Sequence, residues 1–378
     1  MRDASTLPLR LARIAAQRLT DATRLGPDPA AIARAVCAIQ AQSFDAARHQ
    51  FRVRSTGLTA STVNHAFEVE RTVVRTWLMR GTLHLCAADD LRWMLDIFGA
   101  NNTRIGERRR VEVGIDEATA RRGGTVVRKA LAHGPVARRE LRERLLRAGV
   151  LHEPVGQSLI HLLFHLASIG VICCGPRMGR DDSFVLLDDW VPASHGPSTD
   201  EALRELARRY LAAFGPASAA DFAAWSGLPS GVVKAAMAGI ANETSSFREA
   251  QPELRTLGAR PTDAPADRPI VRLLGNFDTF LLGYRRREHV GDANAEEWIH
   301  QGGGGWIRPV VCVDGWITAG WGLERSGSGF DLKLTPFERH SSRIERGIAQ
   351  EAAAISRFLE QPVRLRSERL VGLTSTPT

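Results

Sequence analysis

The stretch HGPVARRELRERLLRAGV, from His133 to Val150, contains the pattern that decides the fold. It opens with a Gly-Pro step and a small residue, and it continues with the periodicity of an amphipathic helix. A second stretch, FGPASAADFAAWSGLPSGVV, begins at Phe214 and has the same order. Similar stretches at two places in one chain indicate that a single structural unit is repeated.

Each stretch is followed by a second helical segment and then by short β-like segments. These lie within 170–190 after the first stretch and within 245–258 after the second. This order of helix, turn, helix and hairpin is typical of a winged helix, a unit that binds DNA. The N-terminal third has the same order in a more divergent form, with a predicted hairpin at 71–87 that turns at Met79-Arg80-Gly81. We therefore expect up to three winged helices.

The composition changes at about Pro261, where TDAPADRP (262–269) is predicted to be a linker before several strand-like segments. Asp314-Gly315 predicts a tight turn between two of these strands. In the last helical segment Thr335 is the expected N-cap, and Glu338 completes a capping box. A small β unit with a closing helix should therefore end the chain. The four expected domains are 1–123, 124–195, 196–262 and 263–378.

Composition restricts the class of protein and its partners. Lysine and arginine number 50 and aspartate and glutamate 42, so the net charge is +8, almost all of it from arginine. A GC-rich genome would explain the arginines, and so would contact with phosphate, which the guanidinium group binds through two hydrogen bonds. The five cysteines form no C-x-x-C pair, so no zinc-finger or iron–sulfur ligand set is present. Without a signal peptide or a membrane-spanning stretch, a reduced cytoplasmic protein is expected.

Two motifs have an ordinary structural explanation that we prefer. His161 and His165 are spaced to share one helix face, but their leucine neighbours favour packing over metal binding. The glycine run 302–305 is not followed by the Gly-Lys-Ser/Thr of a phosphate loop, so it is interpreted as a flexible hairpin tip. If that tip faces DNA, it would probe a groove or a lesion.

Two arginine clusters mix basic with aromatic side chains, as nucleic-acid interfaces do. They are RTWLMRGTLH, from Arg75 to His84, and GYRRREH, from Gly283 to His289. The alternative for the arginines is a solvated basic loop. For Trp77 the alternative is a core position, which we weigh equally with contact to nucleic acid. Asp278, among apolar residues, is either a structural hydrogen-bond acceptor or part of a site, and the sequence favours the structural role.

VCAIQAQSFDAAR, from Val36 to Arg48, places Gln40 and Gln42 at the end of an apolar helical pattern. Residues two apart point to different sides of a helix, whereas on an extended segment they share one face. A glutamine pair that acts together would therefore require the helix to end before it.

Four strings follow one another across the chain: AIQAQSFDAARHQFRVRS, VRTWLMRGTLHLCAADDL, LLGNFDTFLLGYRRR and RPVVCVDGWITAGW. Together they resemble the AlkZ-type family of tandem winged-helix DNA glycosylases, over roughly residues 8 to 360. Some members protect antibiotic producers from their own DNA-alkylating products. The resemblance implies an α+β fold in which three tandem winged helices form a concave DNA-facing surface. A C-terminal β-barrel-like unit with a closing helix would follow them.

The family's catalytic signature of Gln, an apolar residue and Gln falls on Gln40, Ala41 and Gln42. The resemblance implies that both glutamines point into a cleft, with the helix ending near Ile39. A purine alkylated at N7 is cationic and leaves without protonation, so the enzyme needs only to place water and stabilise the oxocarbenium ion. Two amides, each about 2–4 kcal/mol, would supply this for cationic lesions.

The resemblance also implies partners and contacts. We expect double-stranded DNA with alkylated purines, including bulky adducts or interstrand crosslinks, as the partner of a monomer. The expected DNA-binding residues are Arg75, Trp77, Arg80, His84, Arg285, Arg286 and Arg287, with Asp278 as an accessory residue. No metal or organic cofactor is implied. No lysine lies near the glutamines in the sequence, so lyase chemistry is not expected. The alternative is a non-catalytic winged-helix DNA-binding protein, a regulator or a damage-binding factor.

Overall fold

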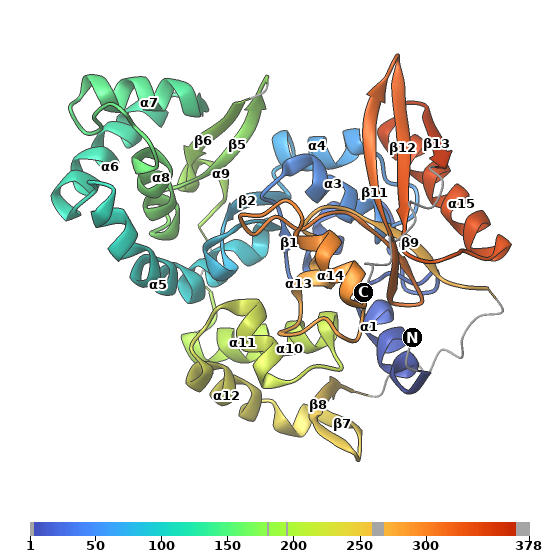
Figure 1. Cartoon of the computed structure of the whole chain (residues 1–378). Coiled ribbons are helices and arrows are strands. Elements are labelled where there is room, and N and C mark those ends of the chain that lie inside the picture. The colour runs from blue at the N-terminus through green and yellow to red at the C-terminus, as the bar shows by residue number, and fades with distance from the viewer. Residues whose placement is uncertain (1–3, 180, 194–195, 259–267, 368–378) are drawn as a thin grey trace, which may run out of the picture.

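A computed structural model describes residues 4–179, 181–193, 196–258 and 268–367 (Figure 1). Four parts follow one another along the chain, and the N-terminal part lies between the other three (Figure 1). The first part contains α1 (Leu7–Ala16), α2 (Pro29–Ala35), β1 (Ile39–Gln40), α3 (Phe44–Val53), α4 (Ala60–Glu68), β2 (Val73–Trp77), β3 (Leu83–Ala87) and α5 (Ala88–Glu112). The second contains α6 (Glu117–Leu131), β4 (Val136–Ala137), α7 (Arg138–Arg147), α8 (Ser158–Ser168), β5 (Ile172–Met178), β6 (Asp181–Leu186) and α9 (Leu187–Trp190).

The remaining parts complete the α+β fold. The third contains α10 (Thr199–Phe214), α11 (Ala219–Ser226), α12 (Ser230–Ala238), β7 (Thr244–Arg248) and β8 (Gln251–Leu257). The fourth contains β9 (Val271–Leu274), α13 (Thr279–Leu282), α14 (Ala293–His300), β10 (Val310–Val313), β11 (Trp316–Ser326), β12 (Gly329–Pro336), α15 (Ser342–Leu359) and β13 (Val363–Ser367). Short 3-10 turns lie at Ala4–Thr6, Met79–Gly81 and Ala241–Glu243.

The predicted order of helices and hairpin occurs in all three of the expected stretches. The hairpins are β2/β3, β5/β6 and β7/β8, and each is antiparallel. After each Gly-Pro step the chain pairs with the second hairpin strand before a helix begins. Val136 pairs with Phe184 in β6, and Ala217 forms a bridge with Arg255 in β8. The first repeat therefore has a short third strand beside its hairpin, and the second has a single bridge at the same place.

The glutamine segment occupies the corresponding place in the first part. There β1 pairs with β3, the second strand of its hairpin, and α3 follows directly. Ser43 caps α3 by accepting a hydrogen bond from the backbone N–H of Ala46. The segment is therefore extended because it is the short strand of a repeated unit.

The first two hairpins join into one sheet, with the strand order β1-β3-β2-β5-β6-β4. Arg75 of β2 pairs with Cys174 of β5, so the sheet crosses the expected boundary at 123/124. Pairing two hairpin edges satisfies backbone groups that a separate hairpin would leave open. Joining the hairpins in this way also fixes the orientation of the second part against the first.

The C-terminal sheet has the strand order β13-β12-β11-β10-β9, and its apolar face packs against α15. Asp314 and Gly315 both have positive φ in the two-residue turn between β10 and β11, as predicted. The predicted capping box at Thr335 is wrong. Thr335 lies in β12 and pairs with Gly320 of β11, and α15 begins seven residues later, capped by Ser341. The expected barrel-like closure stays a prediction.

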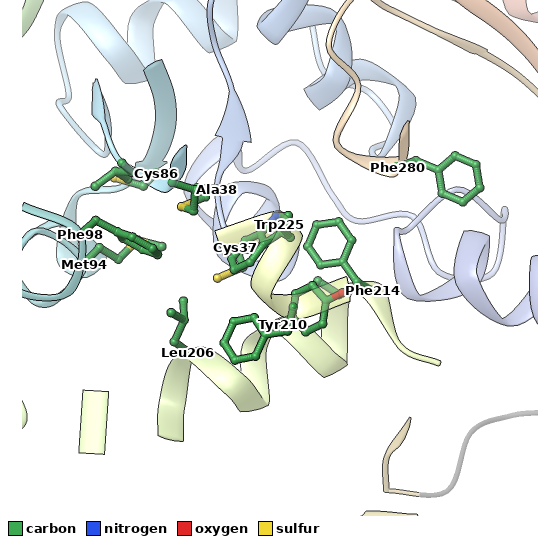
Figure 2. Packing of buried hydrophobic residues seen from close by; sticks show 14 of the residues in the cluster. Cys37, Ala38, Cys86, Met94, Phe98, Leu206, Tyr210, Phe214, Trp225 and Phe280 are labelled. Atoms are coloured by element: carbon green, nitrogen blue, oxygen red, sulfur yellow. The ribbon is translucent and has the colours of Figure 1, made fainter. Parts of the chain in front are cut away.

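A buried aromatic cluster joins the third part to the first and the fourth (Figure 2). Tyr210, Phe214 and Trp225 pack around one another close to Cys37 at the end of α2. The Tyr210 hydroxyl donates to the carbonyl of Gly283 at 2.9 Å, and the Tyr284 hydroxyl donates to that of Phe214, also at 2.9 Å. These reciprocal hydrogen bonds connect α10 to the fourth part.

Candidate active site

The α2 helix ends at Ala35, and the chain turns sharply before it becomes extended. Cys37 and Ala38 both have positive φ, 54° and 78°, which ends the helical course. Both side chains are buried, so surrounding packing holds this uncommon backbone conformation in place. The prediction that the helix ends near Ile39 is confirmed.

Gln40 is the last residue of β1 beside β3, and Gln42 lies two residues further on, in the bend before α3. Gln40 is paired with His84 in the ladder, and the backbone N–H of Ala41 donates to the carbonyl of Leu83 at 2.7 Å. Gln42 lies beyond the strand, so the expectation that the two glutamine side chains share one face stays a prediction. Directly paired residues share a face, so His84 lies beside Gln40.

Each glutamine amide has a fixed orientation. The Oε1 atom of Gln40 accepts a hydrogen bond from Arg80 Nη2 at 2.7 Å, and that of Gln42 accepts from the backbone N–H of Leu83 at 2.9 Å. A guanidinium group and a peptide N–H only donate, so these contacts identify the oxygen of each amide. Gln40 is 6% exposed whereas Gln42 is exposed, so Gln42 is the more accessible of the two.

Arg75 supports the backbone of the glutamine segment. Its Nε donates to the carbonyl of Ala41 at 3.0 Å, and its Nη2 lies 3.5 Å from that of Gln42. Its Nη1 pairs with Asp182 of β6 at 2.8 Å, and the side chain is 4% exposed. In this structure Arg75 is a support from the hairpin side, and its predicted contact with phosphate stays a prediction.

A second support, from α3, was not predicted. Gln50 Nε2 donates to the carbonyls of Gln40 and Phe277, at 3.0 and 3.2 Å. Its Oε1 accepts from the backbone N–H of Thr279 at 3.1 Å. The only signal in the sequence was its place in the first of the four strings, ten residues after Gln40.

Asp278 has a structural role, which is the alternative that the sequence favoured. Its two carboxylate oxygens accept hydrogen bonds of 2.6 and 2.9 Å from Arg54, and both side chains are completely buried. Arg54 Nη2 also donates to Gln17 Oε1 at 2.9 Å, which ties the end of α1 into the same network. A buried ion pair of this geometry fixes three segments relative to one another.

Arg80 lies in the turn between β2 and β3 with a left-handed backbone, φ 56°. Besides Gln40, its guanidinium group donates to the carbonyl of Trp225 in α11. Asn102 of α5 donates to the carbonyl of Leu78 at 2.8 Å, so this turn packs against α5 and α11. Burial lowers the pKa of Arg80 to about 10, which leaves it charged at neutral pH.

Trp77 and His84, the other two predicted DNA-binding residues of the string from Arg75 to His84, are buried. Burial, reinforced by the charge of Arg80, lowers the pKa of His84 to about 3, so the imidazole is neutral. Its Nδ1 lies 2.9 Å from the carbonyl of Thr82 and must donate, which leaves Nε2 as an acceptor. Trp77 packs between Phe164 and Phe184, so the core alternative for this residue is the one observed.

The three consecutive arginines after Tyr284 have different surroundings. Arg285 and Arg286 are exposed, and Arg286 has a loose contact of 3.8 Å with Glu288. Arg287 is less accessible, and its guanidinium group donates to the carbonyl of Leu281 and to Glu296, both at 2.9 Å. The first two are therefore free to meet a phosphate, while the third is held within the protein.

Two findings concern larger features of the described residues. No group of three or more histidine, cysteine or acidic side chains among them is arranged to hold a metal ion. The paired histidines at 161 and 165 lie on α8, where burial lowers the pKa of both.

No helix in the described ranges is long and apolar enough to cross a membrane.

The site thus consists of two oriented amides at the end of β1, a neutral imidazole on the neighbouring strand β3 and one buried arginine. Uncharged groups of this kind suit a reaction in which the departing group needs no proton. The family model described as DNA glycosylase AlkZ-like matches residues 33–358, so the chain belongs to the AlkZ-like DNA glycosylase family, as the resemblance implied.

Two matches, a protein sequence and a solved structure, come from Streptomyces sahachiroi. One, named an interstrand DNA cross-link repair glycosylase, is 26% identical over 346 residues, which cover 88% of this chain and 91% of that protein. The solved structure of the Streptomyces sahachiroi DNA glycosylase AlkZ is similar with a TM-score of 0.75 at 25% identity. That match covers 97% of this chain and all of the other.

Proposed function

We propose that this protein is a monofunctional DNA glycosylase that hydrolyses the N-glycosidic bond of N7-alkylated purines in double-stranded DNA. The observation that carries the proposal is the segment from Gln40 to Gln42, whose backbone is held by Arg75 and Gln50 and whose two amide oxygens each accept a hydrogen bond. Bulky adducts and interstrand crosslinks belong to the proposed substrates, because the similar Streptomyces protein is named for crosslink repair.

The two glutamines have unequal parts in the proposed reaction. Gln42 is exposed, and its carbonyl oxygen keeps one lone pair free after the contact with Leu83. That lone pair accepts a hydrogen bond from the attacking water and points negative charge toward the oxocarbenium ion. The oxygen of Gln40 accepts a hydrogen bond from the Arg80 cation and its side chain is buried, so its remaining lone pair is less accessible to water than that of Gln42.

Other features support the remaining parts of the proposal. The three lysines lie in α6, α12 and β12, so none is on the glutamine segment to form a Schiff base. The three helix–hairpin stretches are consistent with three winged helices that together present a concave DNA-facing surface. Arg285 and Arg286 are proposed to bind phosphates, while Arg75, Arg80 and Gln50 position the glutamines.

A duplex with a single N7-methylguanine tests the proposal. Base release leaves an abasic site that alkali cleaves, and DNA binding is measured separately. Release by the wild type that is lost in Gln42→Ala with binding intact supports the proposed chemistry. Binding without release, for this lesion and for a bulkier adduct, would instead indicate a non-catalytic DNA-binding protein.

A further inference from the structure

The glycine run at 302–305 forms the tip of a loop that leaves α14. Gly303, Gly304 and Gly305 all have positive φ, a backbone course that side-chain-bearing residues rarely adopt. The loop is closed by a hydrogen bond of 3.1 Å from the backbone N–H of Arg308 to the carbonyl of Ile299. Ile299 is buried, as is Ile307 at the other end, so the base of the loop is anchored.

This anchored loop presents an exposed indole. Trp306 is 43% exposed and is the one aromatic residue among the strongly exposed large apolar side chains of the described ranges. Its ring lies edge-on to that of Phe277, with centroids 4.8 Å apart and an angle of 74°. The side chain is therefore held in place while part of the indole remains open to solvent.

Phe277 connects this indole to the glutamine segment. Its carbonyl shares the Gln50 Nε2 donor with the carbonyl of Gln40, so the two backbone segments are neighbours. The backbone N–H of Phe277 lies 3.3 Å from the carbonyl of Ile307, the residue after Trp306. Trp306 thus contacts Phe277, whose carbonyl shares its Gln50 donor with the carbonyl of Gln40.

The loop also begins beside the arginine run. Arg287 Nη1 lies 3.2 Å from His300 Nε2, and the carbonyl of His300 accepts a hydrogen bond from Gly303. The exposed Arg285 and Arg286 directly precede Arg287 in sequence. An open aromatic surface near exposed arginines has the chemistry of a base-stacking site, since every nucleobase offers a π face.

We propose that Trp306 is a nucleobase-binding residue that stacks on a base unstacked at or beside the lesion. The inference rests on the proposed function for its ligand, alkylated duplex DNA. A damaged base costs the least to unstack, so the contact favours lesion-containing over undamaged duplex. Because Phe277 and Gln40 share the Gln50 donor, a base stacked on Trp306 would lie near the glutamine segment.

Binding is measured in a Gln42→Ala background, so that the lesion survives, with an N7-methylguanine duplex and its undamaged counterpart. Trp306→Ala should raise the Kd for the lesion duplex about 10-fold, the size of one lost stacking contact. Trp306→Phe should retain most of the affinity but lose the quenching of tryptophan emission on binding. Trp306→Leu keeps apolar bulk without a π face and should behave like the alanine variant, while Val69→Ala, at another exposed apolar side chain, should have no effect.

Two results would overturn the inference. One is a Trp306→Ala variant that binds the lesion duplex as the parent does; the other is a Trp306→Phe variant that keeps the full quenching. Neither depends on turnover, so both are distinct from failure of the proposed function. That failure would show as no base release by the wild type while the Trp306-dependent quenching persists.

Discussion

Arg75 lies across the backbone of the glutamine segment, with its Nε 3.0 Å from the carbonyl oxygen of Ala41. The contact comes from the central strand of a sheet that joins two parts of the chain, and Asp182 of the second part orients the same guanidinium group. Gln50 holds the preceding carbonyl from the opposite direction. The backbone between Gln40 and Gln42 is therefore fixed by contacts that do not involve the side-chain amide of either glutamine.

Arg75→Lys is expected to lower kcat strongly, because an ammonium group cannot reach Asp182 and both carbonyls at once. Loss of a buried donor should also reduce the free energy of unfolding by about 1–3 kcal/mol. Arg75→Gln removes the charge, and in that variant the slope of log Kd against log salt should stay at the wild-type value. A slope reduced by about one would instead show that Arg75 contacts a phosphate.

Arg80 should act through Gln40, which a double-mutant cycle measures. Arg80→Ala and Gln40→Ala are each expected to reduce the rate of base release. The double variant should be no slower than Gln40→Ala alone, with a coupling energy of about 1 kcal/mol or more. Rate losses that simply multiply would contradict this role and indicate an independent contact of Arg80 with DNA.

The three consecutive arginines should differ in their salt dependence. Arg285→Ala and Arg286→Ala are each expected to lower the salt slope of DNA binding by about 0.9, the value for one phosphate contact. Arg287→Ala should leave that slope unchanged and reduce stability by about 1 kcal/mol, because Leu281 and Glu296 lose their donor. Equal slopes for all three variants would refute the distinction.

His84 should make stability depend on pH. Its folded pKa of about 3 lies below the unfolded value of about 6.5, so the unfolded chain takes up the proton first. The stabilisation is complete above pH 6.5 and is lost as the pH falls toward 3, by up to about 1.4 kcal/mol per pH unit. His84→Asn should flatten the pH dependence of the unfolding free energy between pH 6.5 and 5.

His65→Asn, at an exposed histidine of α4, is the matched control for that measurement. Because His84 stays neutral between pH 5 and 8, wild-type kcat should show no titration that His84→Asn removes. A titration of kcat in that range, absent from the variant, would mean that His84 gains or loses a proton during turnover.

The parts of this structure that could be predicted are those that depend on local patterns. The two Gly-Pro repeats indicated their helices and hairpins, and Asp314-Gly315 indicated its turn. The paired glutamines indicated an end to their helix before the structure showed why. In each case neighbouring residues determine the backbone conformation, so a short stretch of sequence contains the necessary information.

The unpredicted parts depend on residues that are far apart in the chain. Asp278 meets Arg54 from 224 positions away, and nothing in either local sequence names the partner. Arg75 was indistinguishable from a surface arginine until Asp182 and Ala41 were placed around it. Thr335 had the features of a helix cap, but strand pairing with Gly320 outweighed that local preference.

The measurement that tests the proposed chemistry most directly is single-turnover release of N7-methylguanine from a duplex by the wild type and by Gln42→Ala. Gln157→Ala, at an exposed glutamine in the second part of the chain, is the matched control. We predict that Gln42→Ala lowers the rate about 10²- to 10³-fold with Kd close to the wild type, and that Gln40→Ala has a smaller effect. Wild-type rates in Gln42→Ala would contradict the central claim that this amide positions the water.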